Sequence, residues 1–175
     1  MKKIVLNSEN KKTREIIKST MATDISLCQS FENLFNDHNK QLELLKNLNT
    51  NIDFNEKKFL LNQIKSKIQS YKSQDLKKDI HTKNLLISLD NTILKLLNSQ
   101  LKCYYCKCNV FLFFETVRFK KQWTLDRLNN LDEHTNDNTI ISCLECNLQR
   151  RRKNSEKFLF TKQLQTQQLE IKKLQ

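Results

Sequence analysis

Apolar residues in the first hundred positions recur at the three- and four-residue spacing that is typical of amphipathic helices. The two stripes before a polar break at 47–51 consist of Ile16, Ile17, Met21, Ile25 and Cys28, and of Phe31, Leu34, Phe35, Leu42 and Leu45. The two stripes after it consist of Leu60, Leu61, Ile64, Ile68 and Tyr71, and of Leu86, Leu89, Ile93 and Leu97. Asp53 followed by Glu56 predicts a capping-box start for the third helix, and the fourth is expected to begin near Thr82. We interpret the stripes as packing faces, so residues 1–100 are expected to form a helical region.

The pattern changes at Leu101. Clusters of aromatic and β-branched residues between polar turns predict short strands at 110–114, 116–119, 123–125 and 139–141. Helical spacing returns at Cys143 and predicts a helix to about Arg152. A last helix is expected from about Ser155 to the end, with an apolar side made of Phe160, Leu164, Ile171 and Leu174. The expected fold class is therefore α+β, with a helical region at 1–100 and a mixed module with a C-terminal helix at 101–175.

Glycine and proline are both absent from the chain. Their absence excludes the Gly-rich phosphate loops of nucleotide-binding folds, in which the backbone must come close to the phosphates. Turns must use Asn, Asp and Ser instead, and the clearest candidates are Asn129–Asn130 and Asp137–Asn138. A length of 175 residues suits one hydrophobic core and leaves no room for a second full-sized domain.

The chain is basic, with 31 Lys and Arg against 19 Asp and Glu and a net charge of +12. Such a chain is attracted to polyanions such as nucleic acid or an anionic membrane surface. No apolar run approaches the roughly 20 residues of a membrane-spanning helix, and the run at 4–6 is too short for a signal peptide. We therefore expect an intracellular protein, whose six cysteines indicate metal binding rather than disulfides.

Two Cys-x-x-Cys pairs, Cys103 with Cys106 and Cys143 with Cys146, have the spacing of zinc knuckles. The segment between them is too short to bury enough apolar surface by itself, whereas structural zinc contributes about 10 kcal/mol or more of binding free energy. Cys108 lies beside the first pair and is interpreted as a spare thiol. Four thiolate ligands leave no open coordination position, so this zinc is expected to be structural.

The residues between and after the knuckles carry a further motif. Its parts are Trp-Thr-Leu-Asp-Arg-Leu-Asn-Asn at 123–130, His134, Asp-Asn-Thr at 137–139, and Cys-Leu-Glu-Cys-Asn at 143–147. In this order they resemble the HNH endonuclease family, most closely its zinc-knuckle branch from phages and large DNA viruses. The resemblance covers about residues 101–165 and, more faintly, 71–78. It implies a small zinc-stabilised ββα-metal module that hydrolyses nucleic acid with the help of a divalent cation.

The resemblance also implies roles for three side chains. Asp126 and Asn147 match the family's ligands of a catalytic Mg²⁺ or Mn²⁺, and oxygen ligands of this kind suit such a cation. Asn147 directly follows Cys146, so the structural zinc would fix its position. Asn138 matches the family's central Asn, whose side chain bonds across the loop; its alternative interpretation is an ordinary turn residue.

Arg127 departs from the better-known pattern, which has a general-base histidine directly after the metal-binding Asp. Arg cannot accept the proton, because its pKa stays above about 12. It could instead hold the scissile phosphate or stabilise transition-state charge. His134 matches the family's Gly-His and is the candidate base, with a loop residue and water activation by the metal alone as alternatives.

A basic run, Arg150, Arg151, Arg152 and Lys153, follows Asn147 and is expected on the same helix. Helical spacing would then place Arg150 and Arg151 beside Asn147, where they could contact phosphates. Otherwise the run is a solvated surface.

The motif and the charge together predict a metal-dependent endonuclease, with DNA as the expected substrate. The alternatives are a catalytically inactive nucleic-acid-binding module and a viral structural protein; the pair Asp126 and Asn147 favours the enzyme, because a module that only binds needs no second metal. The expected location is the cytoplasm or nucleus of a host, a viral replication site or a virion. No membrane partner is expected, and the N-terminal helices leave self-association or a protein partner open. No motif indicates the form of the substrate.

Overall fold

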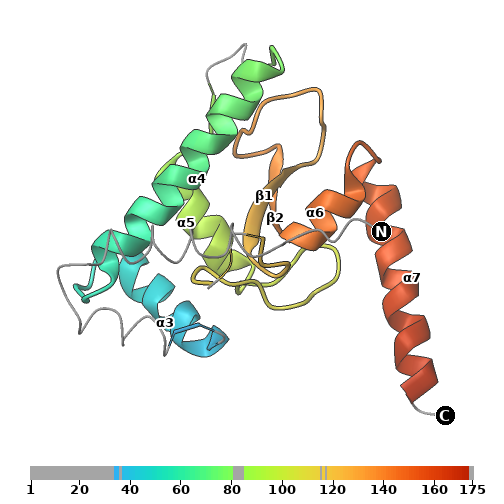
Figure 1. Ribbon diagram of the computed structural model, residues 1–175, viewed down its shortest axis with the longest axis horizontal. Helices are drawn as coiled ribbons and strands as arrows, with labels where there is room; N and C mark the ends of the chain where they lie inside the picture. The colour runs from blue at the N-terminus through green and yellow to red at the C-terminus, as the bar shows by residue number, and fades with distance from the viewer. Residues whose placement is uncertain (1–33, 36, 81–84, 115, 117, 174–175) are drawn as a thin grey trace, which may run out of the picture.

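A computed structural model describes residues 34–35, 37–80, 85–114, 116 and 118–173. The predicted helix with the stripe from Ile16 to Cys28 lies outside these residues. In chain order the described elements are α3 (His38–Asn49), α4 (Lys57–Lys77), α5 (Leu89–Asn98), β1 (Trp123–Arg127), β2 (Thr139–Cys143), α6 (Leu144–Arg150) and α7 (Ser155–Lys173). Helices and a two-stranded antiparallel sheet form a mixed fold, in which α4 and α6 lie on opposite sides of the hairpin and α7 leads away from it (Figure 1).

Polar residues with a free acceptor determine where two of the helices begin. The Asp37 side chain accepts a hydrogen bond from the backbone N–H of Lys40 and caps the start of α3. The Ser88 side chain accepts one from the backbone N–H of Asn91 and caps the start of α5. The expected start near Thr82 is wrong, because the chain at 85–88 is not helical. The predicted capping box is also wrong: α4 begins at Lys57, and the Asp53 carboxylate lies 3.7 Å from the Lys57 ammonium instead.

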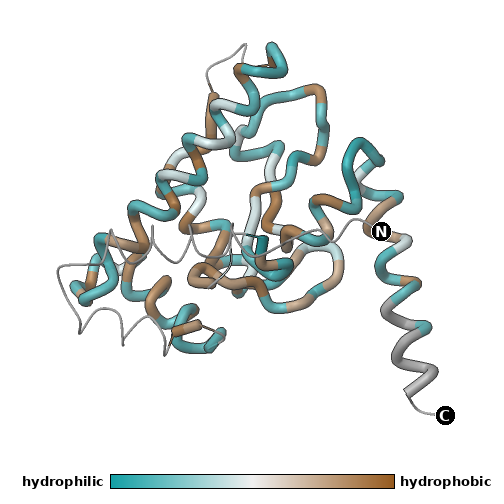
Figure 2. Tube along the Cα trace, viewed as in Figure 1, coloured by the Kyte–Doolittle hydropathy of each residue, from teal (hydrophilic) through white to brown (hydrophobic). Residues whose placement is uncertain are grey.

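The apolar stripes of the helices form the core, as the sequence predicts. Along α4 the side chains of Leu60, Ile64, Ile68 and Tyr71 are buried. They belong to one cluster with the apolar residues of α5 and of the hairpin, so a single core includes residues from both sides of position 100. In Figure 2 the C-terminal end of α4 and the turn between α6 and α7 are hydrophilic.

Only two of the four predicted strands are present among the described residues. The segments 123–125 and 139–141 lie in β1 and β2, paired with Asp126 opposite Ile140 and Arg127 opposite Thr139. Residues 110–113 are buried but form no strand. Phe111 makes an isolated parallel bridge with Gln122, and the backbone groups that follow bind the Gln41 side chain of α3. Its oxygen accepts from the backbone N–H groups of Leu112 and Phe113, and its nitrogen donates to the Phe113 carbonyl. Segment 116–119 forms no strand either, as far as it is described.

Candidate metal and nucleic-acid site

Four cysteine sulfurs come together at the base of the hairpin. The Sγ atoms of Cys103, Cys106, Cys143 and Cys146 all lie within 4.8 Å of one another, and those of Cys106 and Cys143 are 3.8 Å apart. Sulfurs bound to zinc at about 2.3 Å in a regular tetrahedron are about 3.8 Å apart. The donor set and its spacing therefore fit a metal ion such as zinc.

The backbone prepares both knuckles for this arrangement. Lys107 has a φ of 59°, a left-handed conformation that turns the chain after Cys106. Cys143 is the N-cap of α6, and its sulfur accepts from the backbone N–H of Cys146 at 3.4 Å. A helix N-terminus favours negative charge, so this position suits a thiolate. Cys108 is partly buried and is not one of the four clustered cysteines.

A cleft of about 1130 Å³ lies next to this cluster, between the C-terminal end of α4, the end of β1 and α6. We call it the α4–α6 cleft. Its lining brings together Asp126, Arg127, His134, Asn147 and the basic residues 151–153. Most of the residues singled out from the sequence therefore line one cleft.

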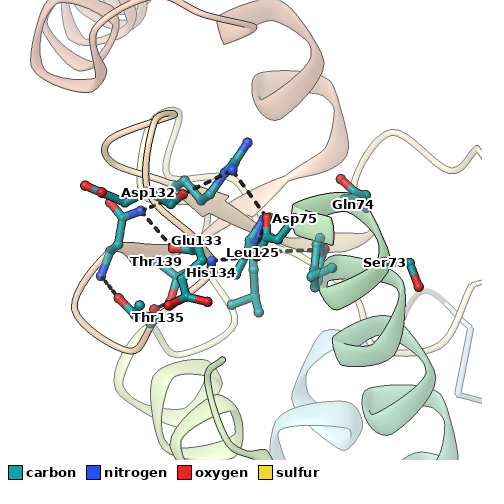
Figure 3. A network of polar contacts seen from close by, with 12 residues as sticks. Ser73, Gln74, Asp75, Leu125, Asp132, Glu133, His134, Thr135 and Thr139 are labelled. Carbon is teal, nitrogen blue, oxygen red and sulfur yellow. Dashed lines mark hydrogen bonds and ion pairs between the residues drawn. The ribbon is translucent and has the colours of Figure 1, made fainter. Parts of the chain in front are cut away.

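A buried carboxylate beside the cleft joins two distant parts of the chain. Figure 3 shows Asp75 of α4 pointing toward His134, which lies in the loop between β1 and β2. The His134 Nδ1 atom is 2.7 and 2.8 Å from the two carboxylate oxygens, and the His134 backbone N–H donates to the same carboxylate at 2.8 Å. Because a carboxylate only accepts, Nδ1 carries the proton, and Nε2 is the basic nitrogen of the neutral ring.

The surroundings of His134 keep the imidazole neutral and oriented. The ring is 4% exposed and lies against the Tyr71 ring, with centroids 4.7 Å apart. Burial lowers the pKa of His134 below its usual value, with the Asp75 carboxylate acting in the opposite direction. Nε2 has no hydrogen-bond partner within the described part of the chain, so it remains available as a proton acceptor.

Asp126 is held by two side chains. One carboxylate oxygen accepts from Arg150 at 2.8 Å, and the other accepts from the Tyr105 hydroxyl at 2.8 Å. Burial raises the pKa of the Asp126 carboxyl, while Arg150 and Tyr105 act to lower it. Each oxygen keeps a further lone pair, so these bonds orient the carboxylate without using all of its acceptor capacity.

Asn147 and Asn138 are held in different ways. The Asn147 amide nitrogen donates to the Thr124 hydroxyl and, at 3.4 Å, to the Leu125 carbonyl, which leaves its amide oxygen as the available ligand atom. The Asn138 side chain bonds across the loop, accepting from the Asn129 backbone N–H and donating to its carbonyl. Asn138 thus ties the end of β1 to the start of β2.

The structure places Arg127 against α4. Its guanidinium donates to the Asp75 carboxylate at 3.3 Å and to the Asp132 carbonyl at 3.1 Å, and its side chain is buried. Asp75 therefore lies between His134 and Arg127, and the arginine neutralises the carboxylate that orients the histidine. This is a role that the sequence did not suggest for Arg127.

The interpretation of Arg150 as a phosphate-contacting surface residue is wrong. Its side chain is 1% exposed, and its guanidinium is taken up by Asp126 and by the Leu128 carbonyl. The helix also ends at Arg150, so the basic run does not continue along one helix face. Arg151, Arg152 and Lys153 lie in the exposed turn after it and line the cleft.

Replacing Arg150 by alanine is therefore expected to destabilise the fold rather than to weaken phosphate binding. Loss of one partner from a buried ion pair leaves an uncompensated charge and costs about 3–5 kcal/mol. Arg151→Ala is the matched control, because this neighbouring arginine is exposed. Urea denaturation of both variants tests the expectation, and equal stability of the two would contradict it.

Sequence reasoning missed Asp75 and Tyr105. Asp75 was detectable, since it follows Tyr71 by four residues on the buried stripe of α4 and is itself buried. An acidic residue on an apolar helix face needs a partner, which points to a basic side chain elsewhere. Nothing local marks Tyr105 as the partner of Asp126.

Comparisons of the chain with protein-family models, with curated proteins and with solved structures gave no match. None of the helices in the described part of the chain is long and apolar enough to span a membrane. The fold and the site thus define a mixed helix-and-hairpin protein with a four-cysteine cluster that can hold a metal ion.

Proposed function

We propose that this protein is an HNH-type endonuclease that hydrolyses nucleic-acid phosphodiester bonds with a divalent cation, with DNA as its first expected substrate. One observation carries the proposal. In a single cleft, a histidine whose proton position is set by a buried carboxylate lies with the two oxygen-bearing residues of the motif and with a basic turn.

His134 is the proposed general base. Its Nδ1–H is held by Asp75, so Nε2 can accept the proton of an attacking water molecule, and Asp75 stabilises the positive ring that results. His134 thus takes the role of general base, which Arg127 cannot take. Arg127 acts through Asp75 and is a positioning residue.

Asp126 and Asn147 are the proposed ligands of Mg²⁺ or Mn²⁺. The fit rests on their donor atoms, because Asp126 offers a carboxylate with unused lone pairs and Asn147 an amide oxygen whose nitrogen is already bonded. When bound, the cation would supply Lewis-acid stabilisation of phosphate charge. Arg151, Arg152 and Lys153 are the proposed phosphate contacts beside the cleft.

The four cysteines are the proposed ligands of a structural zinc ion. Asn147 lies one residue after Cys146 on α6, so the metal would also fix the position of this proposed cation ligand. The zinc thereby supports both the fold and the cleft.

A second candidate function has one observation in its favour. Asp126 is 5% exposed and already neutralised by Arg150, which is the environment of a structural ion pair. If that is its whole role, the protein is a zinc-stabilised nucleic-acid-binding module.

The experiment that separates the two functions compares wild type with Asp126→Asn. Asparagine keeps an oxygen for Arg150 and an amide near Tyr105, but it lacks the charge that a cation needs. We expect Mg²⁺- or Mn²⁺-dependent nicking of plasmid DNA by the wild type and a rate about 10²-fold lower for the variant, with nucleic-acid binding retained. The divalent cation should be omitted and added back, because a chelator would also remove zinc.

Branched DNA, single-stranded DNA and RNA complete the substrate series. Binding of these nucleic acids without Mg²⁺- or Mn²⁺-dependent cleavage of any of them would show that the protein is the binding module.

A further inference from the structure

A second hollow lies on the other side of α6, between α6, α7 and the segment 118–122, with a volume of about 1450 Å³. We call it the α6–α7 groove. The basic side chains that line it are Arg118, Lys120, Arg151, Lys153, Lys157 and Lys162. The acidic residue in its lining is Glu145, whose carboxylate already lies 3.4 Å from the Lys120 ammonium. The groove thus carries a large excess of positive charge and is complementary to an extended anion.

The lining of the groove also has an apolar part, made of Leu144, Leu148 and Phe158. Leu148 is 62% exposed, although it lies on the helix that carries the clustered Cys146 and the proposed cation ligand Asn147. A nucleic-acid duplex presents phosphates outward and keeps its bases stacked inside, so it makes little use of apolar surface. A single strand offers both phosphates and base faces, which matches a lining that is both basic and apolar.

The groove adjoins the α4–α6 cleft. Leu148 of α6 lines both hollows, as do Arg151, Lys153 and Asn154 of the turn between α6 and α7. This turn, seen between the two helices in Figure 1, therefore lies at the boundary that the hollows share. A strand that leaves the cleft over this turn enters the groove directly.

Arg151, at the centre of that boundary, has an unfavourable backbone conformation. Its φ is 53° and its ψ −113°, a conformation that glycine adopts far more readily. The position nevertheless carries a charged side chain that reaches both hollows.

We propose that the α6–α7 groove binds a single-stranded nucleic-acid segment that continues from the α4–α6 cleft. Binding in the groove stands on its own observations. That the segment belongs to a substrate to be cut rests on the proposed function, and it makes branched or tailed DNA a better substrate than blunt duplex.

The test uses charge reversal on two sides of the groove, Arg118→Glu with Lys157→Glu, in the full zinc-loaded chain. Both residues are exposed. The matched control is Lys46→Glu with Lys58→Glu, which makes the same charge change on exposed residues of α3 and α4. The probes are a labelled oligodeoxythymidine of about 20 nucleotides, longer than the roughly 4–16 nucleotides held by a single-strand-binding fold, and a blunt duplex. Binding is measured by fluorescence anisotropy without divalent cations.

We expect the groove variant to bind the single strand at least 10-fold more weakly than the control variant, while both bind the duplex alike. The slope of log affinity against log salt should fall by about 1.4 or more, since each lost phosphate contact on a single strand removes about 0.7. Equal binding of the single strand by the two variants overturns the proposal. The proposal is also overturned if polyglutamate displaces the labelled strand as readily as unlabelled strand does, because the groove would then be an acidic-peptide site.

Arg151→Gly provides an independent check. This substitution relieves the unfavourable backbone conformation at position 151, so the melting temperature should stay the same or rise. It also removes a side chain that lines both hollows, so single-strand affinity should fall about 3-fold or more. Unchanged affinity overturns the path over the turn. If all variants cleave duplex normally and bind the single strand unchanged, the groove proposal fails and the nuclease proposal stands. If strand binding depends on the groove but the protein cleaves nothing, the nuclease proposal fails and the groove proposal stands.

Discussion

Cys143→Ser is expected to abolish metal binding and to unfold the part of the protein around the hairpin. The Cys143 sulfur is one of four that lie within 4.8 Å of one another, and it also caps the start of α6. The binding free energy of structural zinc, about 10 kcal/mol or more, is comparable with the whole stability of a small domain, about 5–15 kcal/mol. Near-ultraviolet circular dichroism and elemental analysis for zinc should show the loss of both structure and metal.

Cys108→Ser is the matched control for this prediction. Cys108 is close in sequence to the first knuckle but is not among the four clustered cysteines. It should keep about one zinc per chain and melt within a few degrees of the wild type. A Cys143→Ser protein that retains zinc and thermal stability would show that the cluster is not the metal site.

The second large effect is expected at His134. If its Nε2 accepts the proton of water, His134→Ala should lower the cleavage rate by about 10²–10⁴-fold while leaving binding of DNA nearly unchanged. The wild-type rate should be constant at neutral pH, since burial lowers the pKa of His134 below its usual 6.5, and should fall as the pH drops through that lowered pKa and the ring becomes charged.

Asp75→Asn tests the positioning role of the carboxylate. Asp75 acts to raise the pKa of His134, so its neutralisation should lower that pKa further and move the acid limb of the pH–rate profile to lower pH. The maximal rate should fall as well, by about 10-fold or more, because the ring loses its anionic hydrogen-bond acceptor. A variant that melts earlier but keeps the wild-type pH profile would assign Asp75 a purely structural role.

Features that depend on neighbouring residues in the sequence were predictable. The buried stripe from Leu60 to Tyr71 follows helical periodicity, β1 and β2 follow their aromatic and β-branched residues, and the four-cysteine cluster follows from the spacing of two pairs. The turn at Asp137–Asn138 is present as well. In each of these the information is local, and periodicity or spacing expresses it directly.

Features that depend on pairing between distant residues were not predictable in the same way. The segment from Val110 to Phe113 has the composition of a strand, yet Gln41 satisfies part of its backbone from α3. Arg150 has the sequence context of a solvated basic run, yet it is the buried partner of Asp126. Tertiary contacts decide these cases, and sequence propensity alone does not contain them.

The reach of Asp75 from α4 to His134 limits how the chain can be divided. Many small metal-binding domains can be joined to other proteins through a loop and still fold. A chimera joined at residue 100 would inherit every cysteine of the cluster and the whole hairpin, but not the carboxylate that orients the histidine and accepts from Arg127. Such a transplant would leave the His134 Nδ1–H without its acceptor and Arg127 without its acidic partner, so residues 101–175 need α4 to keep this arrangement.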